Sequence, residues 1–159
     1  MEVVAFVGPS GTGKSHRALA VAHDNKSEAI IDDGLLIKGT KILAGSSAKS
    51  EQNRIQAVKR AIFSDQEHVD EVKKAIAEAK IERLLVIGTS ENMALKICLR
   101  LGLPKPAKFV KIQDIASKHE INRARQIRLK EGKHIVPVPT VELKPHFVFL
   151  FVCLFFAFS

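Results

Sequence analysis

The segment GPSGTGKS at residues 8–15 constrains the fold of this chain more than any other feature of the sequence. It matches the pattern G-x-x-x-x-G-K-[S/T] in full, between an apolar run at residues 3–7 and a helical pattern at residues 13–23. Glycines at this spacing let the backbone curl until several N–H groups point inward at a helix N-terminus, where the dipole adds partial positive charge. A strand, this loop and a helix in succession predict a phosphate-binding loop.

A loop of this type cradles a nucleotide triphosphate. Lys14 is long enough to reach the β- and γ-phosphates, and the Ser15 hydroxyl is placed to coordinate Mg²⁺. No D-x-x-G follows the loop, because Asp33 and Gly34 are adjacent, so a GTPase is disfavoured and ATP is the predicted nucleotide. The predicted nucleotide-binding residues are Gly8, Pro9, Ser10, Gly11, Thr12, Gly13, Lys14, Ser15 and His16.

Short apolar runs alternate with helical patterns along the rest of the chain. Strands are predicted at residues 3–7, 29–31, 83–87, 109–112 and 134–138. Helices are predicted at residues 13–23, 51–63 and 66–79, from a cap at Thr89 or Ser90 to Leu101, and from a capping box at Ser117 and Glu120 to Lys130, with a loop region around Gly39 and residues 45–47. This alternation predicts an α/β fold of the three-layer P-loop NTPase type, a mainly parallel sheet of about five strands with helices on both faces.

The length of 159 residues predicts one domain, which we assign to residues 1–145. Residues 146–159 form an apolar tail that holds six of the nine phenylalanines. A membrane-spanning helix needs about 20 apolar residues, so this tail is too short to span a bilayer by itself. Because the composition changes abruptly after Pro145, we interpret the tail as an unnatural terminus, with a buried last strand and a membrane-contacting tail as alternatives.

Two acidic residues follow the second predicted strand. Asp32 and Asp33 end the run AIIDD, whereas the later run LLVIG ends without an acid. Because the carboxyl ends of parallel strands line the crevice beside such a loop, these are the candidate magnesium and base carboxylates. Neighbouring residues of an extended chain point to opposite sides, so the two acids are expected to divide these roles. The alternative is a simple turn with the Asp33-Gly34 signature.

The pairing of GPSGTGKS with IIDD resembles the P-loop proteins of the HPr kinase and phosphoenolpyruvate carboxykinase group, over residues 2–34. That resemblance implies phosphoryl transfer with one Asp, Asp32 or Asp33, holding Mg²⁺ and the other acting as base. The strings IIDDGLLIKG, AGSSAK, VIGTSENM and EGKHIVPVPT resemble a family of small bacterial P-loop ATP-binding proteins over about residues 2–144. This second resemblance implies ATP binding without naming a substrate, and the Phe-rich tail departs from it.

Arginines could complete such a site, because phosphoryl transfer spreads negative charge over the equatorial oxygens. Arg125 and Arg128 lie within roughly 60° of each other on the predicted helix 117–130, whereas Arg123 points elsewhere. The alternative is a solvated basic helix. Arg54 and Arg60 are a second source of phosphate contacts, and Thr89 and Ser90 lie where a strand end meets a crevice.

The charge of the chain is unevenly distributed. Residues 96–133 hold eleven of the 25 Lys and Arg residues but three of the 17 Asp and Glu residues, so they carry the whole net charge of +8. Three functions remain open. The leading interpretation is an ATP-dependent phosphotransferase acting on a small-molecule or protein acceptor, the first alternative is an ATPase or nucleotide-gated regulatory module, and the second is nucleic-acid binding through this basic stretch.

The two cysteines, Cys98 and Cys153, are too few for a disulfide framework and lack metal-ligand spacing. The first apolar run lacks the basic lead-in and the cleavage site of a signal peptide. We therefore expect a cytoplasmic protein.

Overall fold

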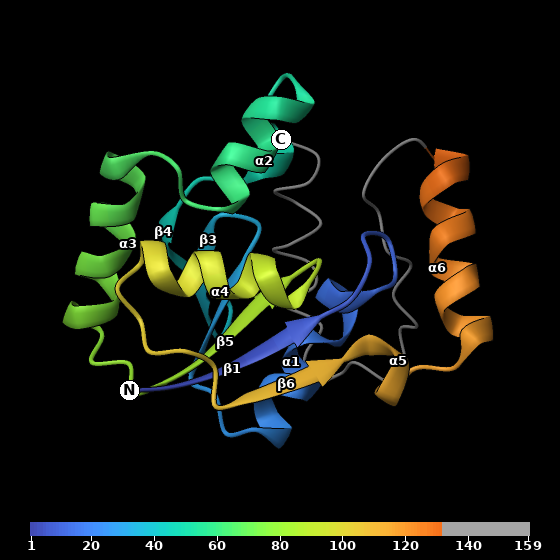
Figure 1. The fold of residues 1–159 in the computed structure, drawn as a ribbon, viewed down its shortest axis with the longest axis horizontal. Coiled ribbons are helices and arrows are strands. Elements are labelled where there is room, and N and C mark those ends of the chain that lie inside the picture. The colour runs from blue at the N-terminus through green and yellow to red at the C-terminus, as the bar shows by residue number, and fades with distance from the viewer. Residues whose placement is uncertain (132–159) are drawn as a thin grey trace.

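The computed structural model describes residues 1–131, so the strand predicted at residues 134–138 and the tail at residues 146–159 lie outside the described residues. The described chain has the α/β class, with a mixed sheet of six strands in the order β4-β3-β2-β5-β1-β6 (Figure 1). The strands are β1 (Glu2–Val7), β2 (Ala29–Asp32), β3 (Leu35–Lys38), β4 (Lys41–Gly45), β5 (Arg83–Gly88) and β6 (Lys108–Lys111). The helices are α1 (Lys14–Asp24), the 3-10 helix η1 (Ala48–Ser50), α2 (Arg54–Ala61), α3 (Gln66–Glu78), α4 (Glu91–Arg100), α5 (Ile112–Ile115) and α6 (Lys118–Glu131).

The four strands predicted within the described residues form the parallel part of the sheet. β1 pairs in parallel with β5 on one side and with β6 on the other, and β5 pairs in parallel with β2. Buried apolar side chains fill both faces of β1, β2 and β5, and continuous apolar runs of this kind are typical of strands covered on both sides, whereas β6 at the edge is only half-buried. The strand ends therefore meet at one edge of the sheet, as predicted.

The loop region predicted around Gly39 is wrong, because β3 and β4 form an antiparallel hairpin there that extends the sheet beyond β2. Leu35, Leu36 and Ile37 are buried, and the pair Lys38 and Lys41 closes a two-residue turn. Gly39 begins that turn with a φ of 60°, which glycine adopts without a steric penalty. The sheet therefore has six strands in the described chain rather than about five, and it is mostly parallel, with the antiparallel hairpin at one edge.

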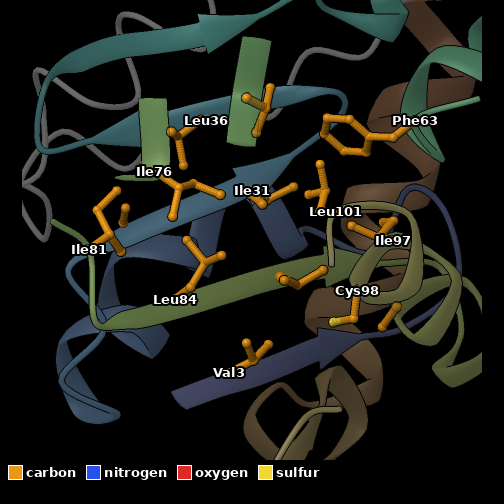
Figure 2. Packing of buried hydrophobic residues seen from close by; sticks show 14 of the residues in the cluster. Val3, Ile31, Leu36, Phe63, Ile76, Ile81, Leu84, Ile97, Cys98 and Leu101 are labelled. Carbon is orange, nitrogen blue, oxygen red and sulfur yellow. The ribbon is translucent and has the colours of Figure 1, made fainter. Parts of the chain in front are cut away.

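Helices cover both faces of the sheet. On one face, α3 and α4 pack their apolar stripes against Val3, Ile31 and Leu84 of the central strands, and Phe63 and Leu101 close the cluster (Figure 2). On the other face, α1 packs against Val4 and Phe6, together with Ile112 of α5 and Ile121 of α6. Burial of these apolar surfaces is the main stabilising contribution to the sheet and holds its carboxyl edge in place.

The predicted helix caps are confirmed where the structure describes them. The Ser90 hydroxyl accepts a hydrogen bond from the backbone N–H of Met93 at 3.1 Å and caps α4. Ser117 and Glu120 form a reciprocal capping box, because each side chain accepts the other's backbone N–H, at 3.2 and 2.7 Å. Among residues 1–131, no helix has the length and apolar character that crossing a membrane requires.

Candidate functional site

A cleft of about 770 Å³ opens at the carboxyl edge of the parallel strands. Its floor is made by the loop after β1, by Asp32 and Asp33 after β2, and by residues 87–89 at the end of β5. One wall is formed by α2 and the segment that leads into it, and the opposite wall by Ala124 and Arg128 of α6. In Figure 1, α2 and α6 stand on either side of the loop that joins β1 to α1. The volume is typical of a small-molecule site.

The glycine-rich loop, residues 8–15, places two of its glycines in a backbone conformation that other residues rarely adopt. Gly11 and Gly13 have φ values of 77° and 89°, in the left-handed region. A Cβ on Gly8 would collide with the side chain of Ile112, and one on Gly11 would lie 2.9 Å from Cδ of Arg128. The glycines are therefore required both by the curl of the loop and by the close packing of α5 and α6 around it.

Lys14 is buried and lies over its own loop. Its Nζ donates hydrogen bonds to the carbonyl oxygens of Gly8 at 2.6 Å and Pro9 at 2.9 Å, and the Thr12 hydroxyl donates to the same Pro9 oxygen at 2.7 Å. Burial lowers the pKa of Lys14 from 10.5 to about 8, against the opposing attraction of Asp32. The ammonium is thus held at the loop with less solvation than in water, so an anionic group beside it would be strongly favoured.

Ser15 and Asp32 connect the loop to the second strand. The Ser15 hydroxyl donates a hydrogen bond to Oδ2 of Asp32 at 2.7 Å, across seventeen residues of sequence. Ser15 lies in the first turn of α1, which follows β1, and Asp32 is the last residue of β2; in the sheet, β5 lies between β1 and β2. A hydroxyl and a carboxylate oxygen are both ligands that Mg²⁺ prefers.

Asp33 occupies a tight turn rather than an extended strand end. Asp33 and Gly34 have φ values of 55° and 85°, and they form the two-residue turn between β2 and β3. This geometry confirms the turn interpretation of the Asp33-Gly34 signature, and Asp-Gly is a preferred pair for such hairpins. The expectation of an extended chain at this point is therefore wrong, although the two carboxylates do contact different partners.

The Asp33 carboxylate is held by the segment after β4. Its Oδ2 accepts hydrogen bonds from the Ser47 hydroxyl at 2.8 Å and from the backbone N–H of Lys49 at 3.1 Å. Burial raises the pKa of Asp33 above its ordinary value and the adjacent Asp32 raises it further, while Lys49 and the hydrogen bonds oppose the rise. The result is a half-buried carboxylate that lines the cleft and takes up a proton more readily than one in water.

Of the two arginines predicted together on one helix, the structure brings Arg128 to the site. Its Nη1 donates a hydrogen bond to the Ser10 hydroxyl at 2.6 Å, and its side chain packs against Gly11. Arg125 is exposed and does not line the cleft, and Arg123 is exposed as well. Glu120 anchors the start of α6 through an ion pair with Arg17 at 2.9 Å.

Some of the remaining predicted site residues line the cleft and others do not. Ser10, Gly11, Gly13, Lys14 and Ser15 line the cleft, whereas Gly8, Pro9, Thr12 and His16 do not. Arg54 and Thr89 also line it. Arg60 is instead paired with Glu51 at 3.2 Å and Asp65 at 3.8 Å, and in the basic stretch Arg100 donates to the carbonyls of Phe63 and Ser64.

Ser47 and Lys49 belong to the site although no sequence pattern predicts them there. They lie fourteen and sixteen residues after Asp33, and no spacing rule links them to it. The β3–β4 hairpin returns the chain to the cleft, whereas the sequence pattern predicts a loop at that place. Within residues 1–131, no group of three or more His, Cys, Asp or Glu side chains is arranged to hold a metal ion.

Comparisons of the chain with protein-family models, with curated proteins and with solved structures found no match.

Proposed function

We propose that this protein binds ATP with Mg²⁺ in the cleft and transfers the terminal phosphoryl group to an acceptor, with a three-layer P-loop NTPase fold as its framework. The observation that carries the proposal is the hydrogen bond between Ser15 and Asp32, at the junction of the glycine-rich loop and the second strand. It brings together the two oxygen ligands that a magnesium nucleotide needs from the protein.

The glycine-rich loop supports binding of the phosphates. Gly11 and Gly13 have the left-handed backbone that such a loop needs in order to direct N–H groups at an anion, and they lie at the N-terminus of α1, where the helix dipole favours negative charge. Lys14 is held there with a pKa of about 8, and a neighbouring phosphate would keep it charged. Its present partners are carbonyl oxygens, which phosphate oxygens would replace as stronger, charged acceptors.

The Ser15 hydroxyl and the Asp32 carboxylate are oxygen ligands of the type, and of the number, that Mg²⁺ takes from a protein when it binds with a nucleotide. Mg²⁺ keeps several waters and is bound in such enzymes by one or two protein oxygens together with substrate phosphates, so a larger cluster of acids is not required. When bound, the ion neutralises the charge that develops on the transferred group. We therefore assign Asp32 as the metal carboxylate.

Asp33 is assigned as the general base. Its raised pKa makes it a better proton acceptor than an ordinary Asp, and both of its described hydrogen bonds go to Oδ2, so Oδ1 is the oxygen left for an acceptor hydroxyl. In the transfer, the hydroxyl proton goes to Asp33 as the hydroxyl oxygen bonds to the γ-phosphorus. The bond from that phosphorus to the bridging oxygen then breaks, and ADP leaves.

Arg128 supplies positive charge at the opposite wall. It contacts Ser10 and Gly11 of the loop, and the negative charge of Asp33 acts on it across the cleft. A guanidinium in this position would stabilise the equatorial oxygens of the transferred group.

The test is calorimetric titration of ATP, with and without Mg²⁺, into the full chain, followed by measurement of ADP formation. We expect magnesium-dependent binding that is lost in Lys14→Ala and loses its magnesium dependence in Asp32→Asn. Asp33→Asn should retain binding but form no ADP. Absence of binding in the wild type would refute the proposal, and ADP formation that no hydroxyl acceptor accelerates would favour an ATPase over a phosphotransferase.

A further inference from the structure

The helix α2 presents its apolar stripe to the cleft instead of to the core. The residues of this segment that line the cleft recur at helical spacing, which puts them on one face. They are Arg54, Ala57, Val58, Ala61 and Ile62. None of the residues of α2 itself is buried, and Val58 is 54% exposed although it lies on this stripe. A surface helix normally buries such a stripe, whereas within residues 1–131 this one faces the cleft.

The stripe stands on the Asp33 side of the cleft. Ser47 and Lys49, which hold the Asp33 carboxylate, belong to the turn around η1, and residues 51–53 lead from that turn directly into α2. The loop residues Lys14 and Ser15 would bind the β- and γ-phosphates, so the wall beyond Asp33 lies past the terminal phosphate. An acceptor must approach the γ-phosphorus from that side, whereas the nucleotide base is at the other end of the triphosphate.

Positive charge gathers at the start of the stripe. Lys49 and Arg54 both line the cleft, and among residues 1–131 no carboxylate forms an ion pair with Arg54. Arg60, on the same helix, is different, because Glu51 and Asp65 neutralise it. The wall therefore combines an apolar surface with an available guanidinium at one end.

We propose that the α2 wall, residues 54–62 together with Lys49, binds the phosphoryl acceptor, and that the acceptor is a small molecule with an apolar body, an anionic group and a hydroxyl. The apolar body packs on Val58, Ala61 and Ile62, the anionic group faces Arg54 and Lys49, and the hydroxyl reaches Asp33. This inference rests on the proposed function. Within a cleft of about 770 Å³ that also holds a triphosphate, the space beside the α2 wall fits a compact acceptor.

The test uses para-hydroxymethylbenzoate as the probe, because it carries an aromatic body, a carboxylate and a hydroxyl. Its binding to the full chain is followed by saturation-transfer NMR in the presence of Mg²⁺ and the non-hydrolysable analogue adenylyl imidodiphosphate. The neutral amide, para-hydroxymethylbenzamide, is the matched ligand that lacks the charge.

Two pairs of variants on α2 separate the cleft face from the solvent face. Arg54→Glu is matched by Lys59→Glu, and Val58→Asp is matched by Ile55→Asp; Lys59 and Ile55 are exposed and do not line the cleft. We expect benzoate binding to weaken about tenfold in Arg54→Glu, which corresponds to loss of one charge-assisted contact. A loss of similar size, about tenfold, is expected in Val58→Asp, whereas both matched variants should bind like the wild type.

Three results would overturn the inference: no binding of the benzoate to the wild type, equal binding of the benzoate in all variants, or equal binding of the benzoate and the benzamide. Weaker binding of the nucleotide analogue in Val58→Asp or Arg54→Glu would also overturn it, because the wall would then belong to the nucleotide. Failure of the proposed function gives a different result from failure of this inference, because the wild type itself would then not bind the nucleotide analogue.

Discussion

Asp32 and Asp33 are neighbours in the chain, yet their carboxylates are held by different parts of the molecule. Oδ2 of Asp32 accepts the Ser15 hydroxyl at 2.7 Å, on the side of the glycine-rich loop, whereas Oδ2 of Asp33 accepts the Ser47 hydroxyl at 2.8 Å, beyond the β3–β4 hairpin. The left-handed backbone of Asp33 turns the chain between them. Two adjacent acids can therefore have different environments and different chemical roles.

The first prediction concerns Asp33→Asn. A raised pKa means that the folded state favours the protonated carboxyl, so stability is lost as pH rises through the folded-state pKa. Asn carries no charge, accepts the same hydrogen bonds and tolerates a positive φ, so we expect its free energy of unfolding at neutral pH to equal or exceed that of the wild type. Urea denaturation measures this, and ADP formation should be lost in the same protein.

Asp70→Asn is the control for this variant, because Asp70 is exposed on α3 and does not line the cleft. It should change neither quantity. A clear loss of stability in Asp33→Asn would show that the charged form is the one that the fold favours.

The second prediction concerns the pH dependence of nucleotide affinity. Lys14 has a pKa of about 8 in the free protein, and a bound phosphate should raise it, so binding above this pH must take up a proton. ATP affinity should therefore fall as pH rises above about 8, by at most about tenfold per pH unit. Titration calorimetry in buffers of different ionisation enthalpy measures the proton uptake, which should disappear well below a pH of about 8, where Lys14 is already charged in the free protein. Affinity independent of pH between about 8 and 9.5 would contradict the assignment.

The third prediction compares Arg128 with Arg125. Arginines that contact a transferring phosphoryl group contribute about 10³- to 10⁵-fold in rate, so Arg128→Ala should reduce ADP formation by about 10³-fold or more. Arg125 is exposed and outside the cleft, so Arg125→Ala should leave the rate unchanged. The rate is measured at saturating ATP, so that a change in nucleotide affinity does not contribute. Similar losses in both variants would point to the charge of α6 as a whole.

The fourth prediction compares two glycines of the sheet hairpins. Gly34 has a φ of 85°, and a Cβ there would collide with the carbonyl oxygen of Ser46. Gly39 has a φ of 60°, and a Cβ there would have no other atom within 4 Å, so substitution costs backbone strain alone. We expect Gly39→Ala to lower the free energy of unfolding by about 1 kcal/mol and Gly34→Ala by about 3 kcal/mol. Equal losses in denaturant unfolding would exclude the collision as a cause.

The fifth prediction concerns His68, which is buried beneath the Asp33-Gly34 turn. Its ring stacks on Phe63 at a centroid distance of 4.4 Å, and its Nε2–H donates to the carbonyl of Gly34 at 2.7 Å. Burial lowers the pKa of His68, against the Gly34 hydrogen bond and the attraction of Glu71 and Asp65, while Arg60 adds to the lowering. As the pH falls, His68 is therefore protonated at a higher pH in the unfolded chain than in the folded protein. The free energy of unfolding should fall as the pH drops below about 6.5.

His68→Gln removes this titration and the ring contact. We therefore expect its free energy of unfolding at neutral pH to be about 2 kcal/mol lower than that of the wild type, and to fall less steeply than that of the wild type as the pH drops. His119 is exposed, and His119→Gln should behave like the wild type. Denaturation measured at several pH values compares the three proteins, and an unchanged acid slope in His68→Gln would assign that slope to other groups.

Much of the parallel sheet could be predicted because its signals are local. The apolar runs of β1, β2 and β5, the caps at Ser90 and Ser117, and the glycine-rich loop each require only a few consecutive residues. The sequence pattern predicts a loop where the β3–β4 hairpin lies, because the pairing of its two short strands depends on contacts across the turn, although Gly39 marks that turn. The return of Ser47 and Lys49 to Asp33 depends on the same hairpin, so the sequence does not predict it either.

The amino-acid sequence by itself determined the glycine-rich loop, the α/β class and the pair of acids at a strand end, because these depend on residue type and short spacing. Tertiary structure decided which acid meets Ser15, which arginine of α6 reaches the loop, and that the stripe of α2 faces a cleft rather than the core. These outcomes depend on contacts between segments far apart in the chain. Such contacts are set by the packing of the whole sheet and its helices, which no local pattern records.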